Sequence, residues 1–214
     1  MGLAVEVGAL ADLEMHDPEG AGWLRAYLAA VNEVLRENGL PEHHEPVELP
    51  ELSTRVDILG FPYSFLHHLR RFYARATTDP DWIPAPTPEG EDPSQDSVLE
   101  EEMYMMSSHL LCHSDCEGFY LPIDFDEILI DSTNQDRIPG GILGSSHRLQ
   151  EELVEIAPKL GIRLEGGKLS DPEAERINAE VESETELWIE NCVWLSLYEA
   201  ARLSIEHGTA VHFS

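Results

Sequence analysis

The longest helical pattern in the sequence lies near its C-terminus, from about Glu184 to His207, and apolar residues cover most of its circumference. These are Leu187, Trp188, Val193, Trp194, Leu195, Leu197, Tyr198, Ala201 and Ile205. A surface helix buries only one stripe, so we expect this helix to lie at the centre of the fold and to end at Gly208. The alternative is an exposed aromatic groove or a self-association face.

Further segments combine helical spacing with end signals. Asp17-Pro18 opens an amphipathic pattern and Gly39 follows it, which predicts a capped helix between them. Other helices are expected at 62–76, in a short segment from Ser97, at 146–160 and from Asp171-Pro172 onward.

Strand signals are shorter and more scattered. Residues 108–113 and 119–123 flank a four-residue turn with Asp first and Gly last, which predicts a β-hairpin with 126–130 as its continuation. Residues 55–59 predict a short strand and residues 210–213 an edge strand. Together these elements predict an α+β fold in which several helices pack on a small mixed or antiparallel sheet, with the long C-terminal helix central.

A segment rich in proline and acidic residues, 77–96, interrupts this pattern. It contains five prolines and little periodicity, which is typical of an extended loop or a linker. We expect one domain over residues 1–214. If the segment is a true linker, the chain divides instead into a helical subdomain, 1–76, and an α+β core, 97–214.

The composition is strongly acidic. The chain has 42 Asp and Glu residues against 13 Lys and Arg, for a formal net charge of −29 at pH 7. Such a field repels phosphate backbones, so direct nucleic-acid binding is not expected, and it accelerates association with a basic partner. The first functional hypothesis is therefore a non-enzymatic binding or inhibitory protein, of an immunity or regulatory type, that acts on a basic protein partner.

The acidity has a second interpretation. Only two basic residues are lysines, Lys159 and Lys168, and a carboxylate-rich surface of this kind stays hydrated in a high-salt cytoplasm. An arginine-biased proteome is the plainer explanation of the same composition. Only the clustering of acids on the folded surface separates adaptation to salt from a binding face.

The densest set of candidate metal ligands is His109, His113, Asp115 and Cys116. On a strand, both histidines and Asp115 project to one face, which would form a two-histidine, one-carboxylate site for a divalent transition metal such as Zn. The alternative functional hypothesis is a metal-dependent, hydrolase-like enzyme that uses this cluster. Structural histidines are the competing interpretation, because the spacing matches no zinc motif.

A glycine-rich loop at 140–146 precedes one predicted helix. Backbone N–H groups at a helix N-terminus bind anions, so Gly141, Gly144, Ser145 and Ser146 predict a small-anion site and a second alternative function. The run lacks the Gly-Lys-Ser/Thr ending of a phosphate-binding loop, and a serine there also explains itself as an N-cap.

The expected location is the cytoplasm. Three cysteines are too few and of the wrong parity for a disulfide scaffold, and the first residues lack the basic start of a secretory signal. No apolar run is long enough for a membrane span. The oligomeric state, the partner and any substrate stay open.

Overall fold

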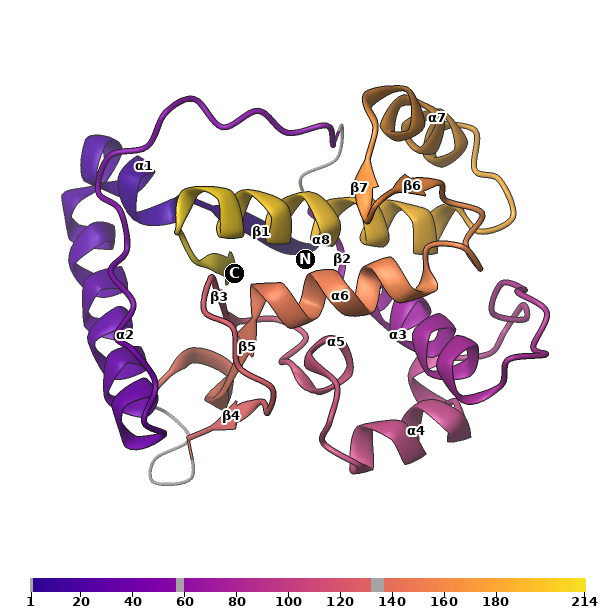
Figure 1. Ribbon diagram of the computed structural model, residues 1–214, viewed down its shortest axis with the longest axis horizontal. Coiled ribbons are helices and arrows are strands. Elements are labelled where there is room, and N and C mark those ends of the chain that lie inside the picture. Colours follow the sequence, from indigo (N-terminus) through magenta and orange to yellow (C-terminus); the bar gives the residue numbers. More distant parts are fainter. Residues whose placement is uncertain (1, 57–59, 132–136) are drawn as a thin grey trace.

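The computed structural model describes residues 2–56, 60–131 and 137–214, and within them the chain forms an α+β fold (Figure 1). The helices are α1 Ala9–His16, α2 Pro18–Glu37, α3 Tyr63–Thr78, α4 Ser97–Tyr104, α5 His109–Cys112, α6 Ser146–Ile156, α7 Asp171–Glu182 and α8 Trp188–His207, with 3-10 turns η1 Pro93–Gln95 and η2 Pro139–Gly141. The strands are β1 Gly2–Val7, β2 Gly60–Pro62, β3 Gly118–Leu121, β4 Leu129–Ile130, β5 Ile142–Ser145, β6 Leu164–Glu165, β7 Lys168–Leu169 and β8 Val211–Phe213. The predicted fold class is confirmed.

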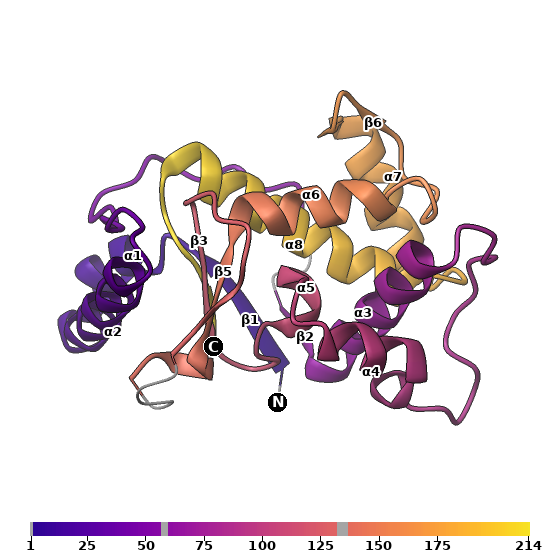
Figure 2. The same cartoon turned by 60° about the horizontal axis from the view of Figure 1, so that its bottom comes forward.

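Six strands form one mixed sheet in the order β2-β1-β8-β3-β5-β4, and β6-β7 form a small second sheet. Side chains of β3 alternate between two cores, because successive residues of a strand point to opposite faces. Phe119 and Leu121 pack with the apolar residues of α2, whereas Tyr120 packs with those of α6 and α8. Both faces of the sheet are therefore covered, with α1 and α2 on one side and α6 and α8 on the other (Figure 2).

Helix α8 is central, as predicted. It contacts α3, α6, α7 and β1, and its residues from Glu190 to Ala201 are all buried. The indole N–H of Trp194 donates to the carbonyl of Leu153 at 2.8 Å, and the ring stacks on Tyr198. This burial contradicts the alternative of an exposed aromatic groove. The helix begins at Trp188, not near Glu184, because Glu184 has a φ of 48° and lies in a turn.

The other long helices also agree with the sequence prediction. The Asp17 side chain accepts from the Gly20 N–H at the start of α2, and α3, α4, α6 and α7 lie where helical spacing places them. Strand β1 and helix α1 were not predicted. Among the described residues, no helix has the length and apolar character needed to cross a bilayer.

The predicted hairpin is wrong. Its first arm is helix α5, which is capped by Ser108, whose hydroxyl accepts from the Leu111 N–H at 3.1 Å. Its second arm, β3, pairs in parallel with β5 and antiparallel with β8 instead of with its neighbour in sequence. In 126–130 only the last two residues form a strand, and they pair with β5. A local turn pattern cannot reveal partners that lie far away along the chain.

Two other strand predictions also need correction. Of the segment 55–59, residues 57–59 lie outside the described residues and residues 55–56 form no strand; the strand of this region is β2. The C-terminal strand β8 exists, but it lies between β1 and β3 and is not an edge.

The glycine loop predicted at 140–146 is mostly strand β5. Gly144 lies inside this strand, where an added Cβ would be 2.3 Å from the ring of Tyr120. The glycine therefore makes room for an aromatic ring, which is a packing role. Ser145 is the N-cap of α6, as its position predicted, and accepts from the Arg148 N–H.

The proline-rich segment contacts the rest of the molecule. Trp82 packs edge-on against Phe72 at 5.1 Å between ring centroids, and Lys159 donates to the carbonyls of Asp79 and Pro80. Ile83 is exposed. The division of the chain into one or two domains stays a prediction.

Candidate functional site: a carboxylate surface without cations

Every arginine of the chain forms an ion pair with an Asp or Glu side chain. The lysines differ: Lys159 donates to backbone carbonyls, and Lys168 is exposed on β7. Among the arginines and lysines, only Arg25, Arg36, Arg163 and Lys168 are exposed as whole residues. Arg70 and Arg71 are buried and the other cations are half-buried. Because every arginine is already paired with a carboxylate, few cations are left to offset the carboxylates that have no ion pair.

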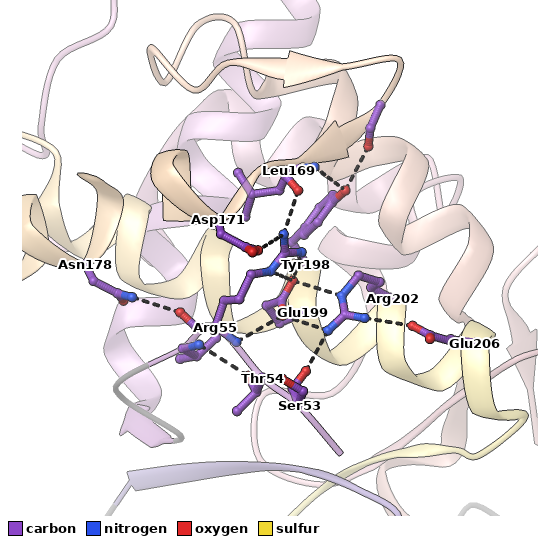
Figure 3. Close-up of polar contacts among 12 residues, drawn as sticks. Ser53, Thr54, Arg55, Leu169, Asp171, Asn178, Tyr198, Glu199, Arg202 and Glu206 are labelled. Carbon is purple, nitrogen blue, oxygen red and sulfur yellow. Dashed lines mark hydrogen bonds and ion pairs between the residues drawn. The ribbon is translucent and has the colours of Figure 1, made fainter. Parts of the chain in front are cut away.

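One side of the molecule shows how the arginines are used. Glu199 on α8 is buried and accepts from Arg55 Nε and Arg202 Nε, each at 3.1 Å (Figure 3). Although burial raises the pKa of Glu199, these two guanidinium groups outweigh it and hold the pKa below its ordinary value. Arg202 also donates to Glu206, and Arg55 to the carbonyl of Leu169. We call this set the arginine clamp.

A groove of about 1100 Å³ lies at the arginine clamp, between α6, α8 and the β6-β7 sheet. Its lining includes the cations Arg55, Arg202 and Lys168 as well as the carboxylates Glu155 and Asp171. The mixture of charges makes this groove a poor match for a purely basic ligand.

In contrast to the arginine clamp, the stretch of sequence between Arg75 and Arg137 is acidic throughout. This stretch contains sixteen Asp and Glu residues and no Lys or Arg. It includes the proline-rich segment, η1, α4, α5, β3 and β4. This gap in the basic residues is readable in the sequence, but the total charge alone does not reveal it.

Helix α4 is fixed within this stretch by one carboxylate. Asp96 accepts from the N–H groups of Val98 and Leu99 as the N-cap, and from Arg71 Nε and Arg75 Nε at 3.1 and 2.7 Å. Burial raises the pKa of Asp96, but the Arg75 hydrogen bond and the capping N–H groups outweigh it and lower the pKa overall. The two arginines that approach α4 are thus paired with its N-cap residue, Asp96.

The orientation of α4 follows from its single fully buried side chain. Leu99 packs with Ala74, Leu111, Cys112 and Ile128. The opposite surface of the helix exposes Glu100 and Glu101, for which no ion pair exists among the described residues. Glu89 and Glu91, on the loop before η1, are equally exposed and unpaired within that part of the chain.

Four consecutive apolar residues follow these acids at the end of α4. Tyr104 is 87% and Met105 67% exposed, and Met103 and Met106 are also exposed. We call these four residues the α4 anchor. Their main-chain conformation is unusual at Met106, whose φ of 54° lies in the left-handed region that favours glycine.

A second exposed apolar group lies at the other end of the molecule. Met15 on α1 is 73% and Trp23 on α2 65% exposed. Figures 1 and 2 both place these helices far from α4. The exposed Arg25 follows Trp23 by two residues on α2 and forms an ion pair with Glu14.

The predicted metal ligands lie near one another in sequence but have other contacts. His109 Nδ1 accepts from the Ser145 N–H at 2.9 Å, and its Nε2 is 3.2 Å from the carbonyl of Asp126. The first bond requires an unprotonated Nδ1, so Nε2 carries the proton and donates. Burial lowers the pKa of His109 and favours this neutral form.

His113 is also held inside the protein. Its ring stacks on Tyr120 at 4.1 Å between centroids, and its nitrogens lie 3.0 and 3.2 Å from the carbonyls of Ser114 and Phe119. Burial lowers the pKa of His113 to about 4. The imidazole is therefore neutral at pH 7 and occupied by backbone groups.

Asp115 forms ion pairs with Arg70 and His67, and Cys116 is exposed. Among the described residues, no group of three or more His, Cys, Asp or Glu side chains is arranged to hold a metal ion. The zinc site gains no supporting contact and stays a prediction.

The four residues of the predicted anion site do not converge on an open space. Ser145 is buried and its hydroxyl donates to the carbonyl of Ile123, while the buried Ser146 hydroxyl bonds that of Ser204. Gly144 faces the Tyr120 ring, and Gly141 belongs to turn η2. Anion binding here likewise stays a prediction.

Among the described residues, the half-buried Glu152 and the buried Glu190 form no ion pair with an arginine. Glu152 accepts from the N–H groups of His109 and Leu110, and burial raises its pKa to about 7 despite these bonds. Burial also raises the pKa of Glu190 to about 7, and its buried Oε1 has no hydrogen-bond partner. Both contrast with Glu199, which shows that arginine contact decides how a buried carboxyl titrates here.

Comparison with known proteins gives one match. A family model described as "Putative DNA-mimic protein" matches residues 1–213. A search of curated proteins and a search of solved structures each found no match.

Proposed function

The chain belongs to the family described as "Putative DNA-mimic protein", and from this premise we propose that it binds the DNA-binding surface of a basic protein in place of DNA. The observation that carries the proposal is the stretch between Arg75 and Arg137, which contains no lysine or arginine. Asp124 and Asp126 of this stretch pair with Arg148, but its exposed Glu89, Glu91, Glu100 and Glu101 have no ion pair among the described residues. The protein then acts as an inhibitor or regulator of its partner.

The electrostatics of DNA explain why such a surface can replace it. Double-stranded DNA carries about one negative charge per 1.7 Å of its axis and a layer of condensed cations, which a binding protein releases. Carboxylates without a cation partner also attract counterions. Glu89, Glu91, Glu100 and Glu101 meet this condition, whereas carboxylates in the arginine clamp are already neutralised.

The inward arginines support this proposal against simple adaptation to salt. High-salt adaptation requires a hydrated surface, which carboxylates anywhere on the molecule provide. The exposed cations occur on α2 and around β6-β7 and are absent from residues 76–136. An uneven distribution of this kind favours a binding face.

Competition with DNA tests the proposal. A fluorescent double-stranded oligonucleotide is bound to a purified HMG-box domain, a basic minor-groove binder, and the protein is added at several salt concentrations. We expect displacement of the oligonucleotide at low salt, and we expect the dissociation constant of the protein–HMG-box complex, measured directly without DNA, to rise steeply as salt increases. An oligonucleotide that stays bound at every protein concentration, or a directly measured dissociation constant that does not depend on salt, would contradict the proposal.

A further inference from the structure

We propose that the α4 anchor docks on a basic protein whose DNA-binding face carries an apolar wedge, as in proteins that kink DNA through the minor groove. The inference rests on the proposed function and adds to it the face of the molecule and the class of partner. The supporting observations are the exposure of Met103, Tyr104, Met105 and Met106, the backbone conformation of Met106 and the charges around these residues.

Within residues 2–56, 60–131 and 137–214, nothing covers the side chains of Tyr104 and Met105, which are 87% and 67% exposed. Single exposed apolar side chains are common, but four in succession form a patch of the kind that marks an interaction site. The segment is also held in place: Asp96 caps α4, and the Cys112 thiol lies 3.8 Å from the carbonyl of Met103 as its hydrogen-bond donor. The patch is thus presented by a fixed element.

The backbone at Met106 has an unfavourable conformation. A left-handed conformation is easy for glycine and unfavourable for other residues. Met106 adopts it with a φ of 54° while its side chain is exposed. The unfavourable conformation at Met106 is therefore not offset by burial of its side chain among the described residues.

The charges around the α4 anchor indicate the charge of the partner surface that binds there. Glu100 and Glu101 precede it on the same helix, and no lysine or arginine occurs between Arg75 and Arg137. A second copy of the chain, with the same net charge of −29, would be repelled. A basic surface is complementary to this face, where no arginine or lysine occurs in the sequence, whereas the other apolar group has Arg25 two residues from Trp23.

The apolar character of the anchor identifies the class of basic partner. Proteins that bend DNA through the minor groove combine Lys and Arg with apolar wedges that insert between base steps. A protein that occupies such a face must also cover the wedge with apolar atoms. Methionine adapts its shape to a contact, and the flat ring of Tyr104 offers a stacking surface as a base does. Proteins that read the major groove with polar side chains have no wedge to cover.

The test compares two double variants of matched composition. Tyr104→Ala with Met105→Ala removes an exposed aromatic ring and a methionine from the anchor, and Trp23→Ala with Met15→Ala removes the same two side-chain types from the opposite end. Circular dichroism checks that both variants fold. Dissociation constants are measured for a purified HMG-box domain, which uses an apolar wedge, and for a C2H2 zinc-finger domain, which reads bases with polar side chains.

We expect the anchor variant to bind the HMG-box domain at least about tenfold more weakly, with an unchanged dependence of log affinity on log salt because no charge is removed. The control variant and the zinc-finger affinities should change little. Equal losses for both variants or for both domains, or no loss at all, would overturn the inference. If the unaltered protein displaces DNA in the competition assay, these outcomes leave the proposed function standing; if it does not, the proposed function itself fails.

Discussion

The arginine clamp and the surface around Glu89, Glu91, Glu100 and Glu101, which we call the α4 side, use glutamate residues in opposite ways. At the clamp, Glu199 is buried and two guanidinium groups neutralise it. On the α4 side, Glu100 and Glu101 are exposed and no arginine reaches them. The two arginines that do approach, Arg71 and Arg75, are bound to Asp96, the N-cap of the helix. A net charge therefore says little about a binding face until the ion pairs are assigned.

The largest expected effect is on the clamp. Glu199→Gln leaves Arg55 and Arg202 without their shared carboxylate, and breaking a partly buried pair of this kind costs about 3 kcal/mol of unfolding free energy. Glu101→Gln, on the α4 side, should change stability by less than about 0.5 kcal/mol. Urea denaturation at pH 7 measures both. Similar losses from the two variants would break the distinction between structural and free carboxylates.

The next effect concerns a buried carboxyl group without an arginine. The folded-state pKa of Glu190 is raised, so its contribution to stability is present below its ordinary pKa and is lost as pH rises through about 7. Glu190→Gln should therefore stabilise the protein by about 2 kcal/mol at pH 8 and by little at pH 5. Thermal unfolding at the two pH values measures this, and a gain that is equal at both would contradict burial as the cause.

A smaller effect separates stability from binding at the anchor. Met106→Gly relieves a left-handed backbone and should raise the unfolding free energy by about 1 kcal/mol. Glu184→Gly is the matched control, because Glu184 is exposed and has a φ of 48°. Both variants should be more stable in urea, but only Met106→Gly should bind the HMG-box domain more weakly. Weaker binding by both would remove the special role of the α4 side.

The smallest effect is on low-salt stability. Replacing Glu89, Glu91, Glu100 and Glu101 with Gln reduces repulsion where no cation is present, and should raise stability at about 10 mM salt by roughly 0.5 kcal/mol. The gain should vanish near 1 M salt, where the Debye length is about 3 Å. A gain that persists at high salt would show that repulsion is not its cause.

The sequence predicted the helices better than the strands for a physical reason. Helical spacing and caps are local, so α2 was readable from Asp17-Pro18 and α8 from its wide apolar stripe. Strand partners are not local: β3 pairs with β5 and β8, and the turn that suggested a hairpin follows helix α5. β8 looked like an edge strand because nothing near it in sequence reveals β1.

The sequence predicted the charge of the partner but not which face of the molecule would bind it. Total charge indicated a basic partner, and the absence of Lys and Arg between Arg75 and Arg137 could have located the face. The inward turn of Arg71 and Arg75 toward Asp96 could not be read, because it depends on the packing of α3 against α4. The histidine cluster suggested a metal site because of its residue types, but His109 and His113 form hydrogen bonds with backbone groups.

The most direct test of the central claim uses two variants with the same charge. One carries Glu→Gln changes at Glu89, Glu91, Glu100 and Glu101; the other carries them at Glu165, Glu175, Glu182 and Glu186, which are exposed on the β6 and α7 side. The affinity of each for the HMG-box domain is measured as a function of salt. The account predicts a clear loss of affinity and a shallower salt dependence for the first variant only. Equal losses for both would show that net charge alone drives binding and would contradict a binding face on the α4 side.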